Sequence, residues 1–102
     1  MTFEVLAHGL AFPEGPRWHD GALWFSDMYA GEVLRLVPGE APQRVVSVPE
    51  CPSGLGFLPD GRLLVVSMHD RRVLRLNGPA VVHLNGHLNR RFHAHIGARW
   101  RP

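Results

Sequence analysis

The amino-acid sequence repeats itself after forty residues, and this repeat restricts the possible folds more than any other feature. Asp20-Gly21-Ala22-Leu23-Trp24-Phe25-Ser26 aligns with Asp60-Gly61-Arg62-Leu63-Leu64-Val65-Val66, and Val33-Leu34-Arg35-Leu36 recurs as Val73-Leu74-Arg75-Leu76. About forty residues is the size of one four-stranded blade of a β-propeller. A small β-sandwich or barrel with accidental self-similarity is the alternative, but the match covers a turn, a strand and a strand end together. The repeat therefore favours a propeller.

Turn signals divide each repeat into short strands. Asp20-Gly21 and Asp60-Gly61 stand between apolar runs, and this dipeptide favours tight hairpins because both residues tolerate the positive φ of primed turns. No stretch keeps an apolar period of 3.6 residues over three turns, so no substantial helix is expected. We predict an all-β chain with strands near residues 3–7, 15–19, 22–27, 32–37, 43–48, 54–58, 62–67, 72–77 and 80–84.

Two repeats cannot close a propeller ring, and a pair of blades has open sheet edges. The strand expected at 3–7 precedes the first repeat, and in closed rings such a strand completes the last blade. We therefore expect residues 1–89 to form the two N-terminal blades of a truncated β-propeller, followed by an irregular tail at 90–102. The open edges allow self-association, in which several copies rebuild a ring.

Charge is divided unevenly along the chain. The eleven basic residues are all Arg, and with nine acidic residues they leave a net charge of +2. All nine acids lie in residues 1–70, whereas residues 71–102 hold seven Arg and no acid. A uniform nucleic-acid binder does not show this division, so no nucleic-acid partner is expected. No apolar run is long enough to span a bilayer and no secretory signal is visible, so we expect a cytoplasmic protein without a membrane partner.

The tail at 90–102 combines four Arg, two His and Trp100. Clustered Arg beside an aromatic residue can bind phosphate, but a frameshifted or truncated gene explains the lost blade pattern, the lost acids and the short length together. Histidines gather nearby and could chelate zinc or copper, yet no carboxylate or Cys stands at a recognised spacing. Solvated surface histidines are therefore the preferred interpretation of His83, His87, His93 and His95.

One motif carries a family resemblance. Phe12-Pro13-Glu14-Gly15-Pro16, with the residues from Leu10 to Asp27 around it, resembles the opening of the gluconolactonase/regucalcin (senescence marker protein) family. Residues 52–65 are similar to the second blade of its bacterial members, and the resemblance runs from about residue 3 to residue 89. It implies a six-bladed β-propeller that hydrolyses sugar lactones or related esters with a divalent metal, Ca²⁺ or Zn²⁺, at the centre of the ring.

Glu14 is the residue that this resemblance marks as a metal ligand. The prolines at 13 and 16 stiffen its loop, Gly15 permits a sharp turn, and Ca²⁺ takes several oxygen ligands. The family's other ligands, an Asn and an Asp, and its usual catalytic base belong to later blades. We therefore expect one metal ligand without a complete catalytic set, in a chain that is inactive alone. The alternatives are a solvated turn Glu in place of a ligand, and a non-catalytic binding module or an inert truncation product in place of an enzyme fragment.

Asn89 is a weaker candidate for a substrate-binding residue. Family members run Leu-Asn-Asp before an apolar strand at this point; Leu88-Asn89 fits the first two letters, but Arg90 replaces the Asp. A plain turn Asn is the alternative to a residue that faces substrate or metal.

Other conspicuous residues have structural interpretations. Asp27 and Asp70 end corresponding strands and are expected in turns or caps, whereas Trp18, Trp24 and Phe25 are expected to pack the blades. The single Cys51 cannot form an internal disulfide, and no activating base stands near it in the sequence. No phosphate-binding loop, serine-hydrolase or zinc-protease signature occurs.

Overall fold

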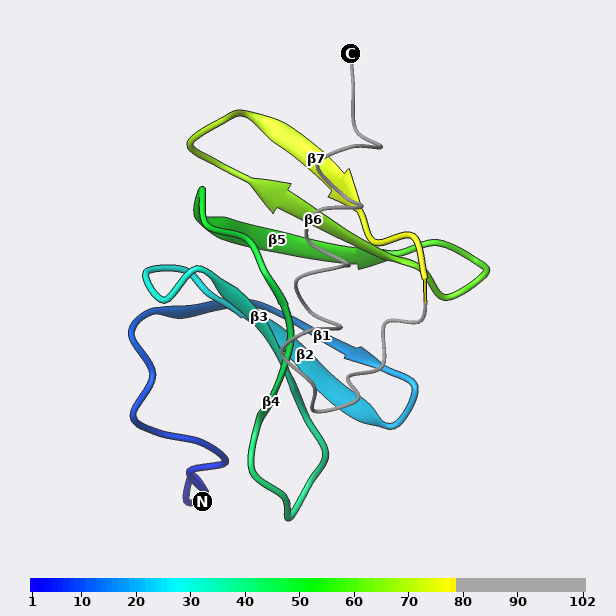
Figure 1. The fold of residues 1–102 in the computed structure, drawn as a ribbon. Helices are drawn as coiled ribbons and strands as arrows, with labels where there is room; N and C mark the ends of the chain where they lie inside the picture. Colours follow the sequence, from blue (N-terminus) through cyan, green and yellow to red (C-terminus); the bar gives the residue numbers. More distant parts are fainter. Residues whose placement is uncertain (79–102) are drawn as a thin grey trace.

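The computed structural model describes residues 1–78 as two antiparallel β-sheets stacked face to face, which confirms the all-β expectation (Figure 1). The first sheet has the strand order β1-β2-β3-β4 and the second β5-β6-β7, so within each sheet every strand pairs with its neighbour in sequence. None of the described residues forms a helix that is long and apolar enough to cross a membrane. The strands are β1 (Pro13–His19), β2 (Ala22–Asp27), β3 (Glu32–Leu36), β4 (Gln43–Ser47), β5 (Pro52–Phe57), β6 (Leu63–Ser67) and β7 (Arg72–Arg75).

The strand predicted at residues 3–7 is wrong, because residues 1–12 contain no strand. A strand needs a sheet edge as its hydrogen-bonding partner, and here Ala7 and Leu10 instead pack their side chains on the first sheet. Strands β1 and β5 both begin two residues earlier than predicted. Each pairs past a bulge near its start, between Glu14 and Arg17 in β1 and between Pro52 and Leu55 in β5. The strand predicted at 80–84 lies outside the described residues.

The two Asp-Gly dipeptides form different turns. Asp20 and Gly21 have φ values of 52° and 74°, which is the two-residue primed hairpin that the sequence predicts. At the second site only Gly61 has a positive φ, of 91°, and its N–H donates to the carbonyl of Leu58 at 2.8 Å. Pro59 holds φ near −65° at the first central position, so it selects an ordinary turn and a longer loop.

Both faces of the first sheet are apolar. Side chains alternate along each strand, so every second residue points toward the second sheet and the others point away. We call these the forward face and the rear face, respectively. The forward face carries Ala22, Trp24, Ser26 and Val33, and the rear face carries Leu23, Phe25, Leu34 and Leu36.

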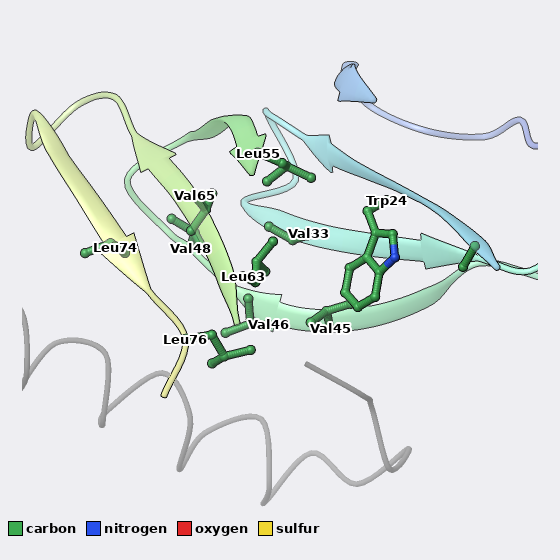
Figure 2. Close-up of a cluster of buried hydrophobic side chains, with 11 residues drawn as sticks. Trp24, Val33, Val45, Val46, Val48, Leu55, Leu63, Val65, Leu74 and Leu76 are labelled. Atoms are coloured by element: carbon green, nitrogen blue, oxygen red, sulfur yellow. The ribbon is translucent and has the colours of Figure 1, made fainter. Parts of the chain in front are cut away.

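The second sheet packs its own rear face on the forward face of the first. Its buried side chains point into the shared core, where they meet those of the first sheet (Figure 2). Burying each such side chain contributes about 1.5–3 kcal/mol, so this contact is the main apolar core of the described residues. The rear face of the second sheet carries Leu63, Val65, Leu74 and Leu76, each forty residues after its counterpart on the first sheet.

A left-handed residue ends the turn before β3 and the turn before β7. Gly31 has a φ of 73°, and Arg71, forty residues later, has a φ of 55°. The N–H groups of both donate to the residue three earlier, at 3.2 Å to Met28 and 3.1 Å to Met68. The same turn is therefore made once with the favoured glycine and once with a side chain that crowds the backbone.

Replacing Arg71 with Gly should raise the free energy of unfolding by about 0.5–1 kcal/mol, since relief of the left-handed strain outweighs the added freedom of the unfolded chain. The matched control, Gly31→Ala, should destabilise, because φ is 73° and the new Cβ would stand 3.4 Å from the Val48 carbonyl oxygen. Thermal unfolding measures both changes. A lower midpoint for Arg71→Gly would contradict the assignment of strain.

The β5–β6 loop holds a carboxylate that should titrate below its ordinary pKa of 3.8. The backbone N–H of Arg62 donates to Asp60 Oδ1 at 3.1 Å, and its Nε lies 2.8 Å from Oδ2; the backbone hydrogen bond is the larger cause of the lowered pKa. The stabilisation is therefore present above pH 3.8 and lost as the pH falls through the lower folded-state pKa. Carboxyl NMR should place this pKa below 3.8, and Arg62→Gln should raise it only partly, because the backbone bond remains. A pKa of 3.8 or above in the folded chain would contradict the contact.

Candidate functional site

Glu14 lies near the start of β1, where it is half-buried and paired with Ser26 of β2. It lines a cavity of about 260 Å³ between the rear face of the first sheet and the segment that precedes β1. Among the described residues of that lining, Glu14 is the only ionisable side chain. The other lining residues are Leu6, Ala7, Leu10, Pro13, Pro16, Leu23, Phe25 and Leu36.

A buried carboxylate anchors the loop that leads to Glu14. Asp27 is only 3% exposed, and its oxygens accept the backbone N–H of Ala11 at 3.1 Å and of Phe12 at 2.6 Å. The N–H of Met28 donates to the carbonyl of Phe12 at 2.8 Å, and the ring of Phe12 lies 4.9 Å from that of Tyr29. The structural role predicted for Asp27 is confirmed, although the segment it caps lies fifteen residues earlier.

The second sheet holds the same loop from the other side. Gly15 has a φ of 68°, and a Cβ on it would stand 2.7 Å from the carbonyl oxygen of Ser53. That oxygen accepts a buried hydrogen bond from Ser26 Oγ at 2.6 Å, and Arg17 Nε donates to the carbonyl of Leu55 at 2.9 Å. The motif Pro13-Glu14-Gly15 therefore meets Pro52-Ser53-Gly54, which has the same Pro-x-Gly pattern thirty-nine residues later, in the second repeat. Glu14 lies beside the point of closest approach.

The described residues do not complete a metal site around Glu14. Within residues 1–78 no three His, Cys, Asp or Glu side chains gather closely enough to hold a metal ion. Ca²⁺ takes about six to eight oxygen ligands, and Zn²⁺ in proteins takes about three or four protein ligands. Glu14 supplies one carboxylate, so no catalytic step through a metal follows from this arrangement.

The remaining residues that the sequence marked have structural surroundings or lie beyond the described part. Asp70 pairs with Arg72 at 2.6 Å in the β6–β7 turn, as a turn residue would. Cys51 is buried at a φ of 77°, before β5. Asn89 and the four histidines at 83, 87, 93 and 95 lie outside residues 1–78.

One of the three aromatic residues expected to pack the blades does not do so. Trp24 and Phe25 are buried, but Trp18 is 64% exposed on the edge strand β1. A ring contact between the two sheets was not predicted from the sequence. His19 stacks on Phe57 of the second sheet with ring centroids 3.7 Å apart, and Phe57 meets Trp24 edge-on at 5.0 Å. Phe57 lies two residues after the buried Leu55, so alternation along β5 places both on the side that faces the first sheet. This alternation is the sequence signal that could have indicated the contact.

Replacing Asp27 with Ala should lower the free energy of unfolding by about 2–4 kcal/mol, because two N–H groups lose a charged acceptor. Hydrogen exchange at the amides of Ala11 and Phe12 should accelerate most. Asp27→Asn is the matched control. It keeps one acceptor oxygen, so its stability and its exchange rates should lie between those of the unaltered chain and those of Asp27→Ala. Unchanged exchange at these amides in Asp27→Ala would show that the carboxylate does not hold the loop.

Comparison with known protein families matches residues 12–92 to the SMP-30/gluconolactonase/LRE-like region. No curated protein matches the chain. The matched region begins at the loop that Asp27 anchors and includes the seven strands found within residues 1–78. The resemblance inferred from Phe12-Pro13-Glu14-Gly15-Pro16 is thereby confirmed, and the chain belongs to the SMP-30/gluconolactonase/LRE-like family.

Proposed function

We propose that the two sheets are consecutive blades of a β-propeller whose activity is the divalent-metal-dependent hydrolysis of sugar lactones or related esters. Family membership supports the reaction class. The forty-residue repeat and the packing of one sheet's rear face on the forward face of the other support the propeller, because propeller blades succeed one another in this order around the ring.

Glu14 is the proposed ligand for Ca²⁺ or Zn²⁺, and the observation that carries this assignment is the fixation of its loop. Asp27 anchors residues 11 and 12, and Gly15 is seated against the backbone of Ser53. A carboxylate on a loop held from both sides loses little conformational freedom when it binds a cation. The proposal places the remaining ligands outside residues 1–78, so the described blades are one part of the active centre.

A second candidate function is non-catalytic binding of a small molecule. It is favoured by the lining of the cavity beside Glu14, which is apolar apart from that one carboxylate. Such a lining suits a ligand with an apolar body and one polar or cationic group. Binding of a lactone without its hydrolysis would favour this candidate over the first.

The carboxylate of Glu14 should make the stability of the chain respond to calcium. Ca²⁺ at ten times its dissociation constant stabilises the folded chain by about 1.4 kcal/mol. A single carboxylate binds Ca²⁺ weakly, so the unfolding midpoint of the 102-residue chain should rise only where the Ca²⁺ concentration exceeds that constant. Glu14→Gln should abolish this rise, whereas the matched control Glu4→Gln, which removes an exposed carboxylate, should retain it. Equal rises of the unfolding midpoint in the unaltered chain, Glu14→Gln and Glu4→Gln would show that the calcium response of this chain does not depend on Glu14.

Sugar-lactone hydrolysis by the same chain should stay at the background rate with Ca²⁺ or Zn²⁺, because one carboxylate does not complete the site. Turnover that requires the metal and is abolished by Glu14→Gln would overturn this expectation. It would show that the chain by itself supplies the whole catalytic set.

A further inference from the structure

The forward face of the second sheet is open and, apart from Arg75, apolar. Val66 and Val73 are paired across β6 and β7, and they are 37% and 48% exposed. Leu64 lies on the same face and lines a shallow hollow with Gly54 and these two valines. Exposed branched side chains set side by side on a sheet mark a surface that another element covers.

The repeat indicates what covers this face. On the first sheet the forward positions Trp24, Ser26 and Val33 are covered by the rear face of the second sheet. Leu64, Val66 and Val73 follow these positions by forty residues. The open forward face of the second sheet therefore corresponds, position by position, to the forward face of the first sheet. That forward face is already covered by the rear face of a neighbouring sheet.

A glycine supports the same conclusion. Gly15 allows the backbone of the following sheet to approach, because any Cβ there would press on the Ser53 carbonyl. Gly54 is the corresponding residue of the second repeat, and it has no positive φ. Among the described residues, a Cβ on Gly54 would meet only Val66 Cγ2, at 3.8 Å. Neither the conformation nor the surroundings of Gly54 in this chain require glycine. Gly54 leaves room for the backbone of a further sheet.

The complementary surface is the rear face of the first sheet. Trp18, which is 64% exposed, pairs with Leu23, and its counterpart Phe57 pairs with Leu63. Phe57 inserts against His19 and Trp24 on a forward face. Trp18 therefore has the position and the chemistry to insert in the same way on a second forward face.

We infer that two copies of this chain dock head to tail, with the forward face of the second sheet in one copy against the rear face of the first sheet in the next. The segment at residues 6–10 now lies on that rear face, where Ala7 and Leu10 pack without forming a strand and leave the cavity beside Glu14. The docked sheet takes the place of this segment. The contact joins two different surfaces, so it extends from copy to copy and closes only if its rotation permits a ring.

Light scattering and sedimentation of the 102-residue chain test this inference. The mass should exceed that of the 11.4 kDa monomer and rise with protein concentration. Trp18→Lys, which alters the rear face, and the double variant Val66→Lys/Val73→Lys, which alters the forward face, should each remain monomeric. Their mixture should reach twice the monomer mass and no more, because one intact pair of faces remains. Phe3→Lys is the matched control; it removes an aromatic side chain that is 99% exposed and should associate as the unaltered chain does.

Cooperative thermal unfolding of each variant in the same buffer shows whether it is folded. Where lysine prevents folding, Val66→Thr/Val73→Thr keeps the branched Cβ that strands favour while removing apolar surface. An unaltered chain that stays monomeric at high concentration overturns the inference. The inference is also overturned if each altered chain, measured alone, associates as much as the unaltered chain. It is overturned as well if the mixture of the two altered chains remains monomeric.

Discussion

The carbonyl group of Ser53 is the contact on which the rest of the described structure depends. It accepts a buried hydrogen bond from Ser26 and lies where any side chain at position 15 would stand, so it fixes how closely β5 approaches β1. A buried carbonyl without a partner costs about 1–3 kcal/mol, which penalises sliding of one sheet over the other. The apolar core supplies most of the stabilisation, and this polar contact determines the relative position of the sheets.

The same contact places the candidate ligand. Glu14 adjoins Gly15, so the loop that carries its carboxylate is fixed by the packing of the two sheets and by the hydrogen bonds to Asp27. A change in the packing of the two sheets would therefore displace the Glu14 carboxylate. Conversely, binding of a cation by Glu14 would stabilise the stacked arrangement of the sheets.

Much of the secondary structure could be predicted from the sequence because its signals are local. Strand β2 has the predicted bounds, and β3, β4 and β6 differ from the prediction by one residue, since alternation and turn residues mark them directly. The predicted strand at 3–7 required a sheet edge that no local signal supplies. The exposure of Trp18 was missed for a similar reason, because an aromatic residue in a strand is buried only when another sheet faces it.

By itself the sequence determined the repeat, the all-β class, the family and the choice of Glu14, because each is written in residue types and their spacing. Only the tertiary structure decided which apolar face meets which. Alternation shows that both faces of the first sheet are apolar, but the packing of forward face on rear face depends on how the chain crosses from β4 to β5. The structure also decided that Asp27 holds residues 11 and 12, since a buried carboxylate binds whichever N–H groups the fold brings to it.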